Sequence, residues 1–281
     1  MSSPAPTTRT PSRVSEAPAW LAPTSLAEAL ELKAEHGGEA TVVAGGTFLA
    51  ILLNARLIAP ARYLALRDVP GLAQVEANGE LRLGAMATHR AVELSPVVRE
   101  RWPTLARTFA LVASPRIRNQ ATVGGVLADA DYASDPPALL TALGARSVVA
   151  RKGGGREIAL EELVTGYYET SLEPDELIVE VRVPPQARAV YRKFRSRSHE
   201  DRPCVGVAAA ERDGELRVVV GAVAGRPQWF PEICEREDPD EIGRRYAAAI
   251  EPISDARGSA EYRRRVIAIE VRRALEELWG G

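Results

Sequence analysis

The first strong helical pattern along the chain is the stretch PTSLAEALELKAEHGG. Its apolar stripe consists of Leu26, Leu30 and Ala34. This spacing of four residues puts the three side chains on one face of an α-helix. Ser25 and Glu28 fit a capping box at the start, and Gly37 offers a stop at the end. We therefore expect a helix between Ser25 and Gly37 whose stripe faces the core.

Short runs rich in β-branched residues follow this helix. TVVAGG predicts a strand that ends on glycines, and RYLALRDV predicts another strand. AQVEANGELRLGA predicts a hairpin in which Asn78 and Gly79 supply the two positive φ values of a tight turn. SVVARKGGGREIAL predicts a second hairpin, and we interpret its glycine run as a solvated turn.

Two helices are expected between these hairpins. Leu105, Phe109 and Val112 mark the first, which should end near Ser114-Pro115. The second follows Asp135-Pro136 within NQATVGGVLADADYASDPPALLTALGA. In that segment the residues TVGG are expected to lead into a polar loop.

The last third of the chain begins with a cleanly alternating strand, ELIVEVRVP. The positions predicted to share one of its faces are Leu177, Val179, Val181 and Val183. Pro184-Pro185 breaks the pattern and marks the expected domain boundary. A basic strand, VYRKFRSR, and two strands joined at Asp213-Gly214 come next.

The chain closes with the helical pattern AEYRRRVIAIEVRRALEELW. Its core stripe consists of Ile267, Val271, Ala274, Leu275 and Leu278. We interpret the arginines of this helix as a solvated face or a subunit contact.

Composition limits the possible functions without identifying one. The 281 residues are 46% hydrophobic and 26% charged, which favours two globular domains or one large domain. The net charge of −2 gives no basic footprint for nucleic acid or for an anionic membrane surface. MSSPAPTTRTPSRVSEAP lacks the apolar core of a signal peptide, so we expect a disordered tail there.

The two cysteines, Cys204 and Cys234, disfavour a disulfide scaffold and favour a cytoplasmic protein. They are also too few for an iron–sulfur cluster, which usually needs about four cysteine ligands. The histidines, His36, His89 and His199, form no ligand-spaced motif, so no metal site is expected. Thr88 should cap the helix that contains His89, and no catalytic role is assigned to this histidine.

Two glycine-containing segments carry the candidate chemistry. In VVAGGTFLA and ATVGG, glycine lets the backbone approach a phosphate, and Thr47 and Thr122 each add a hydroxyl. One such turn is equally well explained as a structural bend. Two of them, about 75 residues apart, suit a dinucleotide pyrophosphate that is held from both sides. A Rossmann motif, with GxGxxG and a later acidic residue, is absent from the sequence.

The order and spacing of several motifs resemble the FAD-binding (medium) subunit of the molybdenum hydroxylases, the family of carbon monoxide dehydrogenase and xanthine dehydrogenase. The motifs are VVAGGTFL, RNQATVGGVLADADYASDPPALLTALGA, YYETSLEPDELIVEVRVP, YRKFRSRSHED and SDARGSAEYRRRVIAIEVRRAL. Together they cover nearly everything from about residue 18 to the end.

The resemblance implies an α+β fold. A tail, residues 1–17, would precede a PCMH/VAO-like FAD-binding domain, residues 18–184, built from α+β subdomains of about 18–70 and 71–184. Residues 188–281 would form a small C-terminal domain with a three-stranded antiparallel sheet and helices.

The resemblance also implies a set of FAD-binding residues. Two segments would wrap the pyrophosphate and ribityl chain: Val42, Val43, Ala44, Gly45, Gly46, Thr47, Phe48 and Leu49, then Thr122, Val123, Gly124, Gly125 and Val126. Asp135 would hydrogen-bond FAD, Leu177 or Ile178 would pack on the isoalloxazine edge, and Lys193 would stabilise charge on the reduced ring. Without the resemblance, Asp135 is most simply a helix cap, Leu177 and Ile178 are core, and Lys193 is a solvated cation.

The chain departs from the family pattern at two positions. Val126 stands where the family usually has Asn or Ser, so any side-chain hydrogen bond there is lost. Asp129 occupies the usual His position. Backbone contacts from Gly124 and Gly125 need no side chain and are expected to survive.

The function implied is electron transfer without a catalytic residue on this chain. A large partner subunit would carry the molybdenum cofactor and a small one two 2Fe–2S clusters, in a dimer of heterotrimers. Non-covalent FAD on this chain would pass the electrons to an external acceptor. The alternatives are a scaffold with weakened FAD binding and a stand-alone FAD-dependent oxidoreductase. The substrate and the acceptor are not specified by the sequence.

Overall fold

The N-terminal part is a small parallel sheet with a helix on each side of the glycine turn. The computed structural model describes residues 17–185, 188–198, 200–234 and 238–280, so the expected tail lies almost wholly outside the described residues. The sheet has the order β1-β3-β2. Its elements are β1 (Ala19–Leu21), α1 (Leu26–His36), β2 (Ala40–Val43), α2 (Thr47–Asn54) and β3 (Arg62–Ala65).

The ends of α1 form as the sequence predicts, but its buried face differs. Ser25 Oγ accepts the Glu28 N–H at 3.1 Å, and Gly37 ends the helix with φ +51°. The prediction for Ala34 is wrong, because it is exposed while Ala29 and Lys33 are buried. Lys33 is tolerated there because its Nζ donates to the carbonyls of Gly37 and Ala40.

The central part is an antiparallel five-stranded sheet of order β4-β5-β10-β6-β7. Its strands are β4 (Val75–Asn78), β5 (Glu80–Gly84), β6 (Arg146–Arg151), β7 (Gly154–Ala159) and β10 (Leu177–Val183). Both predicted hairpins are present. The turn of the first differs from the expectation, because Asn78 pairs with Glu80 and only Gly79 has a positive φ, of +76°.

Helices cover this sheet and fill the space between it and the C-terminal part. They are α3 (His89–Leu94), α4 (Pro96–Arg101), α5 (Pro103–Ala110), α6 (Pro115–Arg118), α7 (Val123–Ala128), α8 (Asp135–Ala142) and α9 (Leu160–Leu163), followed by the short pair β8 (Val164–Gly166) and β9 (Glu169–Thr170). The helix predicted through Val112 ends earlier, at Ala110, and Pro115 begins α6. Ala113, with φ +41°, turns the chain between them.

The strand β10 does not keep its predicted alternation. A β-bulge shifts its register on β6 between Ile178 and Glu180. As a result, Leu177 and Val179 pack in the N-terminal core, whereas Val181 and Val183 pack in the central core together with Ile178. The single face predicted for the four residues is therefore divided between two cores.

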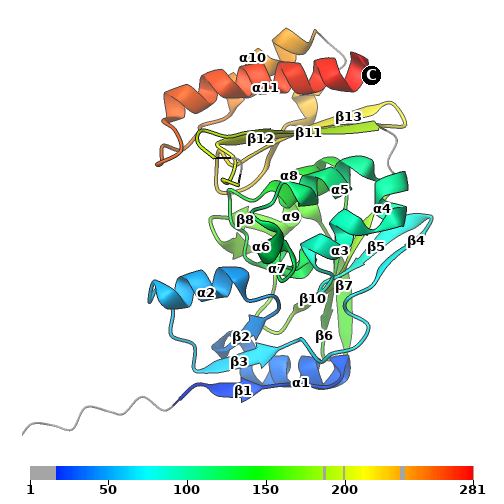
Figure 1. Cartoon of the computed structure of the whole chain (residues 1–281), viewed down its shortest axis with the longest axis vertical. Coiled ribbons are helices and arrows are strands. Elements are labelled where there is room, and N and C mark those ends of the chain that lie inside the picture. The colour runs from blue at the N-terminus through cyan, green and yellow to red at the C-terminus, as the bar shows by residue number, and fades with distance from the viewer. Residues whose placement is uncertain (1–16, 186–187, 199, 235–237, 281) are drawn as a thin grey trace, which may run out of the picture.

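The C-terminal part is an antiparallel sheet with two helices on its outer face (Figure 1). Its three long strands, as expected, are extended by a two-residue edge strand. The elements are β11 (Arg188–Phe194), β12 (Val205–Arg212), β13 (Glu215–Gly221), β14 (Gln228–Trp229), α10 (Pro239–Ala249) and α11 (Ala260–Gly280); two short 3₁₀ turns, Gly37–Glu39 and Pro231–Ile233, complete the list of helical segments. Asp213 and Gly214 both have positive φ and join β12 to β13.

The predicted core stripe of α11 is buried throughout. The interpretation of its arginines as solvated is wrong for Arg263, which is fully buried. Its guanidinium donates to Asp255 and to the carbonyls of Cys204, Ile253 and Gly258. This arginine therefore ties the helix to the loop before it.

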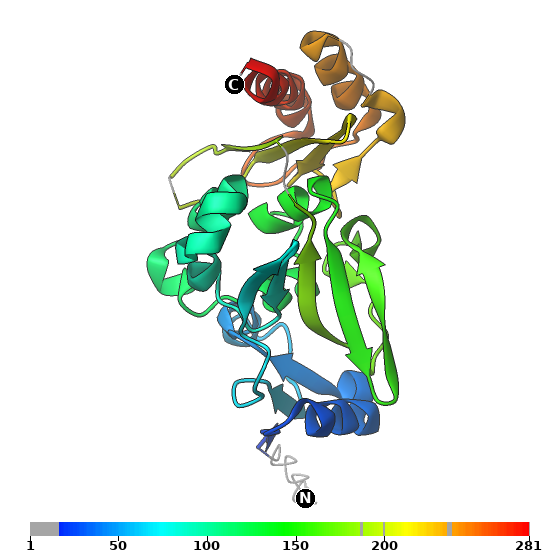
Figure 2. The ribbon, with the colours of Figure 1, turned by 90° about the vertical axis from the view of Figure 1, so that its right-hand side faces the viewer.

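The C-terminal sheet and the central helices share one hydrophobic core. Every residue of α8 is buried, and this helix packs on β12 and β13. Ala208 and Val219 belong to the same cluster as Leu139 and Leu140. The sheet thus lies between α10 and α11 on one side and α5 and α8 on the other, while the long central strands reach down to α1 (Figure 2).

The mixed helix and strand architecture agrees with the predicted fold class. Pro184-Pro185 lies between the last strand of the central sheet and the first strand of the C-terminal one. Of the helices described, none is both long and apolar enough to cross a membrane.

Candidate functional site

A cavity of about 740 Å³ lies where the three parts of the chain meet. Its wall is built from both glycine-containing segments, the start of β10 and the segment that follows β11. The volume is in the range of small-molecule and cofactor sites, roughly 300–1,000 Å³. The N-terminal, central and C-terminal parts therefore all contribute to one site.

The first glycine segment connects β2 to α2 along the wall of this cavity. Ala44 through Leu49 line it. Gly46 caps α2 in the left-handed conformation, with φ +69°. In the described part of the chain, the amides of Thr47, Phe48 and Leu49 have no hydrogen-bond acceptor. These N–H groups and the positive end of the helix dipole make a ready site for an anion.

Gly45 brings the two glycine-containing segments into contact. A Cβ atom on Gly45 would lie 1.9 Å from the carbonyl oxygen of Gln120 and 3.1 Å from Ala121 Cα. Backbone atoms cannot yield as a flexible side chain does, so only glycine fits here. The close approach places the start of α2 beside the segment that leads into α7.

The second segment is a helix, which corrects the expected loop. Thr122 caps α7, and its Oγ1 accepts the Gly125 N–H at 3.1 Å. The amides of Val123 and Gly124 donate to the carbonyls of Ala87 and Ala85. The first-turn N–H groups of α7 are therefore engaged within the protein, in contrast to those of α2.

Gly124 has a packing role in this arrangement. A Cβ atom there would lie 2.7 Å from Ala85 Cβ and 2.9 Å from Ala85 O. Glycine allows α7 to lie directly against the end of β5. Gly125 and Val126 line the cavity, whereas Val123 is fully buried in the central core.

Asp135 and Lys193 form a buried ion pair in the cavity wall. Lys193 Nζ lies 2.8 Å from Asp135 Oδ2 and also donates to the carbonyl of Leu111. Tyr191 donates its hydroxyl to the other carboxylate oxygen at 2.8 Å. Burial raises the pKa of Asp135, and Lys193 opposes that shift. Lys193 is therefore not a solvated cation, and Asp135 does more than start α8.

Leu177 and Ile178 line the cavity at the start of β10 while most of each side chain is buried. The bulge that follows lets two consecutive residues reach the same region. Val42 also lines the cavity, and Val43 does not. Of the residues that the sequence singled out, Val43 and Val123 are the two that stay outside the lining.

Several lining residues were not predicted from the sequence. His89 is buried against Phe109, and its Nε2 lies 3.2 Å from the Thr122 carbonyl. Burial lowers the pKa of His89 to about 4, so the ring is neutral near pH 7. Thr88 caps α3 as expected, through its Oγ1 and the Ala91 N–H. The sequence predicted that Thr88 caps this helix, but it did not predict that the side chain of His89 lines the cavity.

Charged groups from the C-terminal part close one side of the cavity. Arg202 lies 2.7 Å from Asp131 Oδ2, and its guanidinium lies over the ring of Phe48 at 6.0 Å. Phe48 also stacks on Tyr168, with 5.7 Å between the ring centroids. The segment after β11 is thereby joined to the first glycine-containing segment and to the loop that follows α7.

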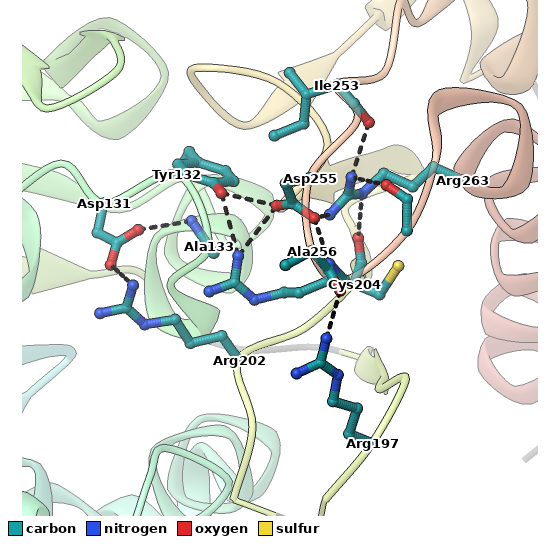
Figure 3. Close-up of polar contacts among 12 residues, drawn as sticks. Asp131, Tyr132, Ala133, Arg197, Arg202, Cys204, Ile253, Asp255, Ala256 and Arg263 are labelled. Atoms are coloured by element: carbon teal, nitrogen blue, oxygen red, sulfur yellow. Dashed lines mark hydrogen bonds and ion pairs between the residues drawn. The ribbon is translucent and has the colours of Figure 1, made fainter.

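A polar network holds this side in place (Figure 3). Tyr132 donates to Asp255 at 2.8 Å, and Arg257 donates to both. Asp255 also accepts from Arg263, and these bonds hold the pKa of its carboxyl well below its usual range. No sequence signal linked Tyr132 to Asp255, because this contact joins positions more than a hundred residues apart.

Asp129 is the lining carboxyl with the most unusual environment. Burial and the neighbouring Asp131 raise its pKa to about 7, while Arg202 acts in the opposite direction. Among the described residues, no cluster of side chains suited to a metal ion is present. The cavity thus offers free backbone amides, buried charges and aromatic rings.

Comparison with known proteins identifies relatives over most of the chain. Residues 13–186 match the family model described as the FAD binding domain in molybdopterin dehydrogenase. A 6-hydroxypseudooxynicotine dehydrogenase complex subunit alpha of Paenarthrobacter nicotinovorans is 34% identical over 89% of this chain and 90% of that protein. The carbon monoxide dehydrogenase medium chain of Hydrogenophaga pseudoflava is 30% identical over 92% of this chain and 96% of its own length.

Solved structures agree with these matches. A carbon monoxide dehydrogenase structure from Hydrogenophaga pseudoflava superposes with a TM-score of 0.88 at 29% identity, covering 94% of this chain and 97% of the other. Quinoline 2-oxidoreductase from Pseudomonas putida 86 gives a TM-score of 0.84 at 30% identity, with 93% and 96% of the two chains covered.

Proposed function

Because this chain belongs to the family of FAD-binding domains of molybdopterin dehydrogenases, we propose that it carries electrons through FAD from the iron–sulfur clusters of a partner subunit to an external acceptor. Its relatives are medium subunits of multi-subunit dehydrogenases, so large and small partners are implied. The chain is the FAD-binding component of an oxidoreductase. The direction of electron flow, the arrangement as a dimer of heterotrimers and a cytoplasmic location belong to the proposal.

The observation that carries the proposal is the anion site at the start of α2. The free amides of Thr47, Phe48 and Leu49 line a cavity large enough for a cofactor. Gly45 and Gly46, which carry no side chain, line the cavity directly before these amides. These residues fit the pyrophosphate of FAD, which is a diphosphate anion with a flexible sugar chain on each side.

The two glycine-containing segments have different roles in this proposal. The first binds the anion through its amides. The second, with its own amides engaged, supports the first through the contact of Gly45 with Gln120 and supplies Gly125 and Val126 to the cavity wall. The expected backbone contacts from Gly124 and Gly125 would therefore be van der Waals contacts, not hydrogen bonds from their N–H groups.

Other lining residues suit the flavin ring. Leu177 and Ile178 offer apolar surface, and the Lys193–Asp135 pair provides a cation held in place by Asp135 and the carbonyl of Leu111. When bound, FAD supplies the redox chemistry, since it exchanges electrons both singly and in pairs. Lys193 would favour negative charge on a nearby reduced ring, as the family resemblance implies.

A non-covalent attachment is also proposed. The described residues that line the cavity include one histidine, His89, and no cysteine. His89 Nε2 is engaged with Thr122, and its Nδ1 is buried without a partner. Neither ring nitrogen is presented as a nucleophile.

The test is to isolate the chain with its accompanying subunits and record the visible spectrum. We expect flavin absorbance from one FAD per chain and release of all of it by acid precipitation. A preparation that stays colourless after FAD is added would contradict the proposal. Flavin that remains with the precipitate would contradict the non-covalent attachment alone.

Electron transfer is tested on the same complex by reducing it stepwise and then adding quinone, NAD or oxygen. We expect electrons delivered by the clusters to bleach the flavin bands, which should then recover with one of these acceptors. A monomer that reduces an organic substrate with NADPH would instead favour the stand-alone oxidoreductase.

A further inference from the structure

Asp129 lacks the ion pair that each buried acid of the cavity possesses. Asp131 pairs with Arg202 at 2.7 Å, Asp135 with Lys193 at 2.8 Å, and Glu176 with Arg156 at 2.7 Å. These three acids and Asp129 line the same cavity. Within the described part of the chain, Asp129 has no cation at ion-pair distance. Its side chain is partly exposed in the cavity wall, and only the longer-range attraction of Arg202 offsets its charge.

The position of Asp129 in the fold adds to this effect. It is the C-cap of α7, where the helix dipole disfavours negative charge. The nearest charged groups are Asp131, which repels it, and Arg202, which is already paired. Together with burial they raise the pKa of Asp129 to about 7.

The surrounding elements contribute few groups that could change this balance. The charged side chains that act on Asp129 are Asp131 and Arg202, and Tyr168 lies in the field of the same two groups. The cavity lining also contains His89, Glu200, Asp201 and Arg257. His89 is neutral, and Arg257 is bonded to Tyr132 and Asp255. The first glycine segment, residues 44–49, has no titratable side chain. No free cation is supplied from these directions by the described residues.

An ionised carboxylate at Asp129 would disfavour binding of FAD, the ligand proposed for this cavity. FAD would bring the negative charge of its diphosphate into the cavity that Asp129 also lines, where an ionised carboxylate would repel it. A neutral carboxylic acid instead has an O–H donor for the oxygen atoms of FAD. We propose that Asp129 binds FAD as a protonated acid, and that ionisation of this side chain weakens FAD binding. The inference rests on the proposed FAD site.

The direction of the pH dependence follows from linkage. Bound FAD favours the protonated form, so binding raises the pKa of Asp129 above its value in the free protein. The affinity for FAD is then constant at pH values below the pKa of Asp129 in the free protein, which is about 7. It falls up to about tenfold per pH unit above that point until the higher value is reached. Binding near neutral pH should take up a proton.

The experiment measures FAD binding to the full chain, with its accompanying subunits, after the flavin has been removed. The dissociation constant is determined by flavin fluorescence from pH 6 to pH 9 for the wild type, Asp129→Asn and Glu173→Gln. Calorimetry in two buffers of different ionisation enthalpy counts the protons taken up by the wild type. Glu173 also lines the cavity but is exposed, so Glu173→Gln is a matched control.

For the wild type and Glu173→Gln we expect the dissociation constant to rise at least tenfold over this range, with uptake of up to one proton at pH 7.5. Asp129→Asn should bind FAD with little change between pH 6 and pH 9. Wild-type binding without a pH slope or proton uptake would overturn the inference while leaving FAD binding intact. A slope that persists in Asp129→Asn would also overturn it. Failure of the wild type to bind FAD at any pH would overturn both this inference and the proposed function.

Discussion

Gly45 is the residue where one added methyl group would disturb the site most. Its Cβ would overlap the backbone of Gln120, so the two glycine-containing segments would have to separate. We expect Gly45→Ala to lower the free energy of unfolding by about 1–3 kcal/mol and to reduce FAD content. Urea unfolding and the flavin-to-protein absorbance ratio measure both effects. Gly38→Ala is the control, since no atom lies near its Cβ and the change should cost less than about 0.5 kcal/mol. Equal behaviour of the two variants would refute the packing argument.

His89 gives a pH dependence of stability that can be assigned to one residue. Its pKa in the folded chain is about 4, below the value of about 6.5 in an unfolded one. As the pH falls from 6.5 toward 4, the unfolded chain takes up a proton that the folded chain does not. Stability is therefore lost in that window, by roughly 2 kcal/mol at pH 5.

His89→Gln should remove this component. We expect the variant to lose less stability between pH 7 and pH 5 than the wild type does, as measured by urea unfolding at both values. An identical loss in the two proteins would show that the ring of His89 is accessible to protons in the folded state.

In the FAD-free chain, the pH dependence of stability caused by Asp129 has the opposite sign to that caused by His89. Its pKa rises from the ordinary value of 3.8 to about 7 on folding, so its ionisation cost grows with pH across that interval and is complete above it. We expect Asp129→Asn to stabilise the FAD-free chain at pH 8 by about 1–4 kcal/mol, and by less at pH 5. Thermal unfolding of the FAD-free protein at the two pH values measures the difference. No gain at pH 8 would mean that water or a cation reaches this carboxyl.

At the level of secondary-structure elements, the Lys193–Asp135 pair joins β11 to α8 across the expected domain boundary. Lys193→Met would leave Asp135 buried without its cation, and we expect a loss of about 3–5 kcal/mol in the free energy of unfolding. Lys152→Met is the control, because the exposed pair of Lys152 with Glu31 should contribute less than about 1 kcal/mol. Adding Asp135→Asn to Lys193→Met should recover part of the loss. Comparable effects of the two lysine variants would contradict a buried pair.

The elements that the sequence predicted well are those whose signals are local. The hairpin at Asp213-Gly214 and the stripe of α11 depend on residues close in sequence, and both formed as expected. The bulge after Ile178 and the helix that begins at Val123 were missed. Both depend on neighbours distant in the chain, since β6 sets the register of β10 and the carbonyls of Ala85 and Ala87 accept the first amides of α7.

The same distinction applies to the site. Family resemblance singled out residues that line the cavity, such as Gly46, Thr47 and Ile178. It did not indicate Asp131 or Arg202, which meet only when the C-terminal part packs on the central one. Asp135 was expected either to cap a helix or to bind the cofactor, and its buried ion pair is a third arrangement that no local pattern encodes.

For the whole molecule, the shared core means that the C-terminal part is not an appendage. Truncation after residue 185 would expose α8 where it packs on β12 and β13. We expect this fragment to aggregate or to unfold at lower temperature than the full chain, and to retain no FAD. Size-exclusion chromatography, circular dichroism and flavin fluorescence provide the readouts. A monomeric, folded fragment that binds FAD as tightly as the full chain would contradict this interpretation.

The cavity is lined by residues from Lys33 to Arg257, so almost the whole chain separates its first contributor from its last. A ribosome completes the segment around Gly45 long before it makes the one around Arg202. The nascent chain therefore has no finished pocket, and the flavin can be captured only after synthesis is nearly complete. Flavin occupancy then reports that translation and docking of all three parts have succeeded.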